Sequence, residues 1–164
     1  MWLAFNASGQ APFRRSEVAV YADVVERIRR LAEATFRAEG LYLTAPTFFS
    51  RISSDKPPKI LNDEYWHEHI DAEQYGSFVY TSLLYLTDAG RDFEGGAFQF
   101  LGAESVADVQ PAKGRLVLFT SGTEHPHRVT RVTAGTRLAL TIAFTCHREA
   151  AIVDFLGRAS PDDP

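Results

Sequence analysis

The stretch "HRVTRVTAGTRLALTIAFT", residues 127–145, alternates between two kinds of side chain along its second half. Alternation with a period of two predicts a β-strand, in which successive side chains point to opposite faces. From residue 137 onward one face is large and apolar: Leu138, Leu140, Ile142 and Phe144. The opposite face is small or polar: Arg137, Ala139, Thr141 and Ala143. The first face predicts a core contact, whereas the second fits either an exposed surface or the wall of a small-molecule cavity.

Other segments after residue 40 have the same strand character. They are rich in β-branched and aromatic residues, and Gly, Pro, Asp and Ser separate them: 41–53, 77–87, 97–101, 115–120, 127–133 and 137–145. Many short strands with frequent turns predict an antiparallel sandwich or barrel, so the chain is expected to be mainly β. The longest polar break, "SDKPPKILNDE" at 54–64, is predicted to be a loop.

One segment before the strands has helical periodicity instead. Its apolar residues recur at spacings of three and four: Val18, Tyr21, Val24, Val25, Ile28, Leu31 and Phe36. Ser16 is the expected N-cap and Gly40 the expected residue after the end of the helix. The pattern predicts an N-terminal amphipathic helix, within about 15–40, that packs on the β core and carries no chemistry.

Length and composition limit the possible classes of protein. With 164 residues, we expect one domain, 1–164, with helical support at about 15–40 and a β core at about 41–150. The net charge of −4 makes nucleic acid an unlikely partner, and the single cysteine excludes an internal disulfide. No apolar run has the length of a membrane span. We expect the chain as given to be soluble and cytoplasmic, or membrane-anchored if it is a fragment.

Four of the five histidines form two clusters, and the first lies in "YWHEHIDAEQYGS", residues 65–77. Because residues i and i+2 of a strand share a face, His69 could converge with Asp71 or with His67, and His125 could converge with His127. Two imidazoles and one carboxylate leave half of an octahedron open, as in non-haem iron oxygenases. An H-x-D triplet alone is a weak signal, and it more often belongs to a polar turn or a surface pair than to a metal site.

Arg137 strengthens the metal interpretation because it follows His127 by ten residues. A planar guanidinium suits bidentate binding of a carboxylate, and a buried arginine without a partner is costly. Gly135 could form a tight turn between a histidine strand and an arginine strand. We therefore expect these strands to be antiparallel neighbours, with His127 and Arg137 opening onto one cavity.

Together these motifs resemble the Fe(II)/2-oxoglutarate-dependent dioxygenases of the prolyl-4-hydroxylase-like branch. The resemblance rests on H-x-D followed by H-x-V-x-x-V-x-x-G-x-R, and it extends from about residue 46 to 147. Between these motifs, "LLYLTD" (83–88), "FEGGAFQF" (93–100) and "PAKGRLVLFTSGTEHPHRV" (111–129) occur in the expected order. The sequences of the segments "WHEHID" and "GTRLALTIAFTC" are most similar to those of the group of 2-oxoglutarate and iron-dependent oxygenase domain-containing protein 3.

The resemblance implies a double-stranded β-helix, or jelly-roll, core and a set of site residues. His69, Asp71 and His127 would be both the metal ligands and the catalytic centre. Arg137 would pair with the distal carboxylate of 2-oxoglutarate, and Tyr85 and Thr141 match positions that often join it. His67 and Glu68 would then lie behind the ligands or at the surface. The implied cofactors and co-substrates are Fe(II), 2-oxoglutarate and O2, with ascorbate as a further candidate.

The implied activity is hydroxylation of a substrate, a protein or peptide side chain by family analogy, with conversion of 2-oxoglutarate to succinate and CO2. The alternative is a non-catalytic jelly-roll that binds a metal or a small acid through the same residues. A plain structural β-sandwich is the third possibility. The sequence predicts neither the identity of the substrate nor the oligomeric state.

Overall fold

The computed structural model describes residues 14–55, 64–102 and 106–152. Residues 56–63 of the predicted loop 54–64, and both ends of the predicted domain, lie outside this part of the chain. The elements in chain order are α1 Arg15–Phe36, β1 Tyr42–Ser53, α2 Asp71–Tyr75, β2 Tyr80–Tyr85, β3 Phe93–Gly95, β4 Phe98–Leu101, β5 Val106–Val109, β6 Leu116–Thr120, β7 His127–Val129, β8 Val132–Thr145 and the 3-10 turn Arg148–Ala150. The predicted mainly β architecture with an N-terminal helix is confirmed.

The larger sheet is built around β8, the longest strand. Its order is β1-β8-β2-β6, all neighbours are antiparallel, and β3 pairs with the first residues of β8. One face of β8 packs against α1, as predicted, through a cluster of buried residues: Tyr21, Val25, Ile28, Ala32, Leu41, Leu140, Ile142 and Phe144. Burial of this apolar surface holds the helix against the sheet and leaves the opposite face of the sheet free for another layer.

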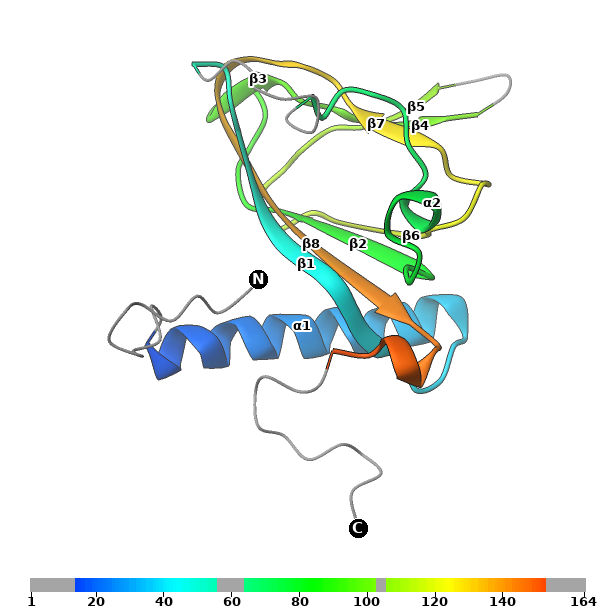
Figure 1. Ribbon diagram of the computed structural model, residues 1–164. Helices are drawn as coiled ribbons and strands as arrows, with labels where there is room; N and C mark the ends of the chain where they lie inside the picture. Colours follow the sequence, from blue (N-terminus) through cyan, green and yellow to red (C-terminus); the bar gives the residue numbers. More distant parts are fainter. Residues whose placement is uncertain (1–13, 56–63, 103–105, 153–164) are drawn as a thin grey trace, which may run out of the picture.

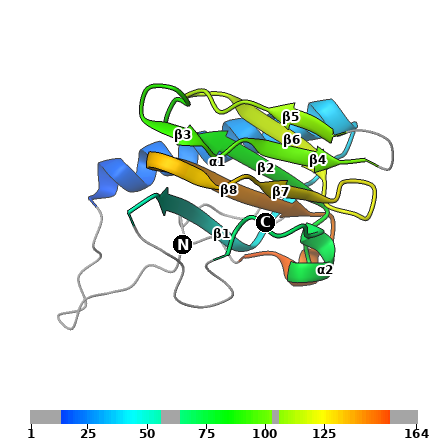
Figure 2. The ribbon, with the colours of Figure 1, turned by 90° about the horizontal axis from the view of Figure 1, so that it is seen from above.

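The smaller sheet, in the order β5-β4-β7, provides that layer. It lies across the larger sheet on the side opposite α1 (Figure 1), and the view from above shows its strands stacked over those of the larger sheet (Figure 2). A second core cluster joins residues of both sheets: Leu83, Tyr85, Phe98, Phe119 and Ala139. The two sheets therefore form the two walls of an antiparallel sandwich with a helix outside it.

The predicted turn at Gly135 is wrong, although the residues on either side of it are strands. Gly135 lies inside the continuous strand β8, opposite Phe93 of β3, and β7 pairs with β4 in the other sheet. A Cβ at Gly135 would lie 2.2 Å from the Asp92 carbonyl oxygen, and its φ is +73°. This glycine permits the close approach of β3, and the chain changes sheets earlier, between β7 and β8.

The ends of the helix also differ from the prediction. The N-cap is Arg14, whose backbone N–H donates to the Glu17 carboxylate at 2.9 Å, so Ser16 lies within the first turn. The helix ends at Phe36 because Arg37 adopts a left-handed conformation (φ 53°). This reversal brings Leu41 into the core, where its N–H donates to the Glu33 side chain at 3.0 Å. The short elements α2, β3 and β5 and the 3-10 turn Arg148–Ala150 were not predicted.

No helix within the described residues combines the length and the apolar character needed to cross a bilayer.

Candidate metal centre

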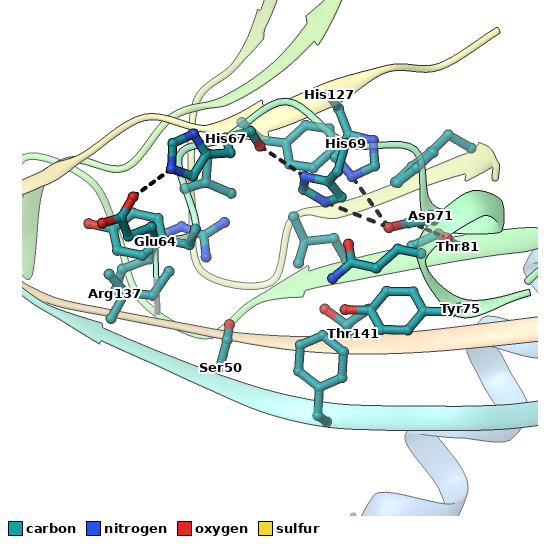
Figure 3. Close-up of a pocket in the computed structure, with 18 residues that line it drawn as sticks. Ser50, Glu64, His67, His69, Asp71, Tyr75, Thr81, His127, Arg137 and Thr141 are labelled. Atoms are coloured by element: carbon teal, nitrogen blue, oxygen red, sulfur yellow. Dashed lines mark hydrogen bonds and ion pairs between the residues drawn. The ribbon is translucent and has the colours of Figure 1, made fainter. Parts of the chain in front are cut away.

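A cavity of about 640 Å³ lies between the two sheets, and residues from both of them line it. His69, Asp71 and His127 line one part of it and Arg137 another, with Ser50 and Thr141 along the wall formed by β1 and β8 (Figure 3). These residues are distant in sequence, and the packing of the sheets brings them to one space. Arg137 and Thr141 thus face a cavity, and the polar side of β8 is not simply exposed.

Backbone pairing fixes the two histidines side by side. The His69 N–H donates to the His127 carbonyl at 3.0 Å, and the His127 N–H donates to the His69 carbonyl at the same distance. Their ring centroids lie 4.3 Å apart. Each Nδ1 lies beside the carbonyl oxygen two residues earlier, His67 at 3.0 Å for His69 and His125 at 2.9 Å for His127. Because a carbonyl only accepts, each Nδ1 carries the proton of this hydrogen bond, and in the neutral form of either ring the free lone pair is on Nε2.

Asp71 completes the group from the first turn of α2. Its Oδ1 lies 3.7 Å from His69 Nε2 and 3.6 Å from His127 Nε2. One ligand atom from each of the three residues lies within 4.8 Å of the other two. The expectation that strand alternation aligns His69 with Asp71 is wrong in detail, since His69 forms an isolated bridge and Asp71 begins a helix. The two side chains nevertheless converge.

The surroundings of His127 favour its neutral form. The ring is buried and lies between Phe98, stacked at 4.9 Å between centroids, and Phe119 at 5.0 Å. Burial lowers the pKa of His127 from its usual value, and the negative charge of Asp71 opposes this effect. A neutral imidazole with a free Nε2 is the form that binds a metal.

The donor set suits Fe(II). Two imidazole nitrogens and one carboxylate oxygen on one side leave three coordination positions open, and each imidazole is oriented by a hydrogen bond at its other nitrogen. The remaining predicted candidates lie elsewhere. His67 contacts the Glu64 carboxylate at 2.6 Å at the rim of the cavity, and His125 contacts Thr120. Among the described residues, neither belongs to the metal-binding group.

At the other part of the cavity, Arg137 is almost completely buried, with 1 % of its surface exposed. Its Nε donates to the Gly96 carbonyl at 3.1 Å, and its Cζ lies 5.2 Å from the centroid of the Tyr85 ring. Its Nη2 and the Tyr85 hydroxyl have no hydrogen-bond partner among the described residues. Burial lowers the pKa of Arg137, but a guanidinium remains charged in proteins. A buried cation with a free donor is suited to an anionic ligand such as a carboxylate.

The two further predicted residues take different places. Thr141 lines the cavity beside Ser50 and Phe48. Tyr85 is fully buried next to the guanidinium and does not itself line the cavity. Burial raises the pKa of Tyr85, opposed by the charge of Arg137, so its hydroxyl stays protonated near neutral pH and able to donate.

Thr81 and Ser121 are polar residues of the site that the motifs did not reveal. Thr81 lines the cavity and donates to Asp71 Oδ2 at 2.6 Å, and Ser121 lies 2.8 Å behind it. The pattern contained a signal for Thr81. It lies four residues before Tyr85 on the same strand, and therefore on the same face.

Comparisons with known proteins agree with this geometry. The profile of the 2OG-Fe(II) oxygenase superfamily, where 2OG is 2-oxoglutarate, matches residues 59–145. The chain is 49 % identical over 152 residues to 2-oxoglutarate and iron-dependent oxygenase domain-containing protein 3 of Rattus norvegicus, covering 92 % of this chain and 48 % of that protein. It is 34 % identical over 161 residues to prolyl 3-hydroxylase 1 of Homo sapiens, covering 87 % of this chain and 21 % of that protein.

A solved structure supports the fold. The crystal structure of a 2OG-Fe(II) oxygenase family oxidoreductase from Burkholderia pseudomallei superposes with a TM-score of 0.63 at 20 % identity, covering 84 % of this chain and 60 % of that one. The jelly-roll fold predicted from the sequence is therefore confirmed. The chain spans about half the length of the rat relative, 48 %, and 21 % of the length of human prolyl 3-hydroxylase 1. By its profile match and its fold, the chain belongs to the 2OG-Fe(II) oxygenase superfamily, whose cofactors and co-substrates are Fe(II), 2-oxoglutarate and O2.

Proposed function

We propose that the chain is a single Fe(II)- and 2-oxoglutarate-dependent oxygenase domain that hydroxylates a protein or peptide side chain. In the overall reaction a substrate C–H, O2 and 2-oxoglutarate give C–OH, succinate and CO2. One observation carries this proposal: a single cavity contains a two-histidine, one-carboxylate group and a buried guanidinium with a free N–H. A dicarboxylic 2-oxo acid has complementary groups for both.

Each of the three metal ligands would bind the metal through one defined atom. His69 and His127 would hold Fe(II) through Nε2 and Asp71 through Oδ1, because these atoms face one another and the other polar atoms of the three side chains are already bonded. When bound, Fe(II) and 2-oxoglutarate supply the activation of O2, of which one oxygen atom enters succinate and the other enters the substrate. The protein supplies geometry at three adjacent positions and leaves the opposite positions open.

Arg137 would orient the co-substrate. Its free Nη2 would donate to the distal carboxylate, and the neighbouring Tyr85 hydroxyl would add a second donor. Both groups lie in a buried region of low dielectric, where a charge-assisted hydrogen bond is stronger than in water. Thr141 lines the same cavity and offers a hydroxyl toward the bound acid. Phe98 and Phe119 exclude water from the side of His127.

The proposed substrate class rests on relatives. A protein named prolyl 3-hydroxylase 1 is 34 % identical over most of this chain, so a prolyl side chain in a peptide is the first substrate to test. Glu64, Tyr65 and His67 line the cavity and are partly exposed or exposed, so a peptide that enters it would contact them.

The test is consumption of 2-oxoglutarate. The purified chain with Fe(II), ascorbate, 2-oxoglutarate and O2 should form succinate without a substrate and should form more with a proline-containing peptide. His127→Ala should reduce succinate formation by roughly 100-fold or more, because it removes a direct metal ligand. Mass spectrometry of the peptide should show the addition of one oxygen atom.

His125→Ala is the matched control. This histidine lies two residues away and outside the metal-binding group, so its substitution should leave most of the succinate formation intact. Succinate formation that is absent in the original chain, or unaffected by His127→Ala, would contradict the proposal. Binding of Fe(II) and 2-oxoglutarate without any turnover would instead support the non-catalytic binding module.

A further inference from the structure

Two buried hydroxyls lie next to Asp71, on the side of Oδ2. The other carboxylate oxygen, Oδ1, is the one that faces the two histidines. Thr81 Oγ1 lies 2.6 Å from Asp71 Oδ2 (Figure 3), and Ser121 Oγ lies 2.8 Å from Thr81 Oγ1. All three residues are buried, each with 5 % or less of its surface exposed. The hydrogen bonds are therefore shielded from competition by water.

The protons of this chain of hydroxyls can run in only one direction. Thr81 Oγ1 donates to Asp71 Oδ2, and a hydroxyl has a single proton to donate. The bond between the two hydroxyls must then be donated by Ser121. Each hydrogen bond polarises the next, so Ser121 strengthens the bond that Thr81 makes to the carboxylate.

The backbone holds the same three residues in place. Thr81 of β2 pairs with Phe119 of β6, which places Ser121 just past the end of β6. The Ser121 N–H donates to the Val79 carbonyl at 2.9 Å, and the Ser121 carbonyl accepts from the Ala72 N–H at 2.9 Å. Ser121 is thus bonded to the residue just before β2 and to the first turn of α2. The position of the hydroxyls relative to Asp71 is set by strand pairing.

We propose that Thr81 is a positioning residue that commits Asp71 to bind the metal through Oδ1 alone, with Ser121 orienting the Thr81 hydroxyl. A carboxylate can give one or two oxygens to a metal. If Oδ2 also bound, it would occupy one of the three positions that a chelating 2-oxo acid and O2 require. The short bond from Thr81 keeps Oδ2 occupied and leaves Oδ1 directed at the two Nε2 atoms. This inference rests on the proposed metal site.

The test measures metal affinity and metal coordination, and it does not depend on catalytic turnover. The full chain, Thr81→Val and Thr81→Ser would be titrated with Mn(II), followed by electron paramagnetic resonance, and loaded with Co(II) for ligand-field spectra. Thr81→Val keeps the shape of the side chain and removes the hydroxyl, so we expect Mn(II) affinity to fall by about 10- to 100-fold. We also expect the Co(II) spectrum to change, because the carboxylate is free to bind differently. Thr81→Ser retains the hydroxyl and should restore Mn(II) affinity to within roughly threefold.

Ser82→Ala is the matched control for the loss of a buried hydroxyl. Ser82 is the next residue of β2 and donates to the Ile142 carbonyl at 2.8 Å on the opposite face of the sheet. Its substitution should lower the melting temperature and leave both metal readouts unchanged. A change in the metal readouts of Ser82→Ala equal to that of Thr81→Val would overturn the proposal, because both would then report general destabilisation.

The outcomes separate this inference from the proposed function. If the original chain binds neither Mn(II) nor Co(II), the metal site itself fails. If it binds both and Thr81→Val matches its affinity and spectrum, only the positioning role fails. If Thr81→Val does not fold, Ser121→Ala decides: we expect Mn(II) affinity to fall by roughly threefold, and an unchanged affinity would overturn the role of the hydroxyl chain.

Discussion

The two functional parts of the cavity differ in how completely the protein satisfies their polar groups. Around the metal-binding group, both histidine Nδ1 atoms donate to carbonyls and Asp71 Oδ2 accepts from Thr81. Around Arg137, one guanidinium nitrogen and the Tyr85 hydroxyl have no partner among the described residues.

This difference shows which part the chain organises by itself. The ligand atoms at the metal-binding group are oriented by hydrogen bonds and by backbone pairing within the chain itself. The region of Arg137 leaves buried donors unsatisfied, at a cost of about 1–3 kcal/mol for each group. A bound carboxylate would recover that cost. Substitutions at the two parts should therefore affect different ligands.

The largest expected effect on 2-oxoglutarate affinity comes from Arg137→Ala. Loss of one partner of a buried, hydrogen-bonded charge pair costs about 3 kcal/mol or more, which corresponds to roughly 100-fold in affinity. The affinity of the Mn(II)-loaded chain for 2-oxoglutarate, measured by calorimetry under nitrogen, should fall by this factor. The affinity for Mn(II) itself should stay within about twofold, because Arg137 contacts none of the three metal-binding residues, His69, Asp71 and His127.

Arg131→Ala is the control for that experiment. Arg131 stacks on Trp66 at 3.9 Å, outside the cavity, so its loss removes a charge without affecting the bound acid. His69→Ala is the mirror substitution and should abolish Mn(II) binding. A larger effect of Arg137→Ala on Mn(II) than on 2-oxoglutarate would remove Arg137 from the co-substrate role.

Gly96→Ala should have an intermediate effect on the same ligand. A Cβ there would lie 3.0 Å from Arg137 Cδ and 2.9 Å from the Phe93 ring, at a φ of +65°. The added Cβ crowds the Phe93 ring and the Arg137 side chain, and we expect the resulting displacement of Arg137 to lower the affinity for 2-oxoglutarate by about tenfold. Gly114→Ala separates crowding from backbone strain, because Gly114 also has a positive φ but its Cβ would meet open space. Equal losses of 2-oxoglutarate affinity in the two variants would argue against a displaced Arg137.

Tyr85→Phe should have the smallest effect on binding and a distinct sign in stability. Removal of the hydroxyl takes away one hydrogen bond from an uncharged donor to the carboxylate of the co-substrate, worth about 1 kcal/mol or roughly fivefold in affinity. Without ligand the free energy of unfolding should stay constant or rise, because the hydroxyl is buried without a partner. Urea titration and calorimetry measure the two quantities. Tyr80→Phe on the helix-facing side is the control, and a stability loss specific to Tyr85→Phe would mean that its hydroxyl already has a partner.

Local patterns predicted much of the fold. The alternation in 137–145 predicted a strand with an apolar face, and that face packs on α1. The helical period predicted α1, while its ends were missed because a capping Glu17 and a left-handed Arg37 set them. Short elements such as β3 and β5 were missed because their pairing with distant strands, and not their own composition, makes them strands.

The candidate site divides in the same way. Residue identity and spacing indicated a metal site and a carboxylate-binding arginine, and the resemblance to a known family then selected His69, Asp71, His127 and Arg137 as the set. Their spatial relation was decided by tertiary structure: the histidines come together through a bridge outside the strand ladders, and Arg137 reaches the cavity from a different sheet than His127. Chain periodicity reports which face a side chain occupies, but sheet packing decides which faces meet. The hydroxyls of Thr81 and Ser121 and the unsatisfied donors near Arg137 exist as features only after that packing.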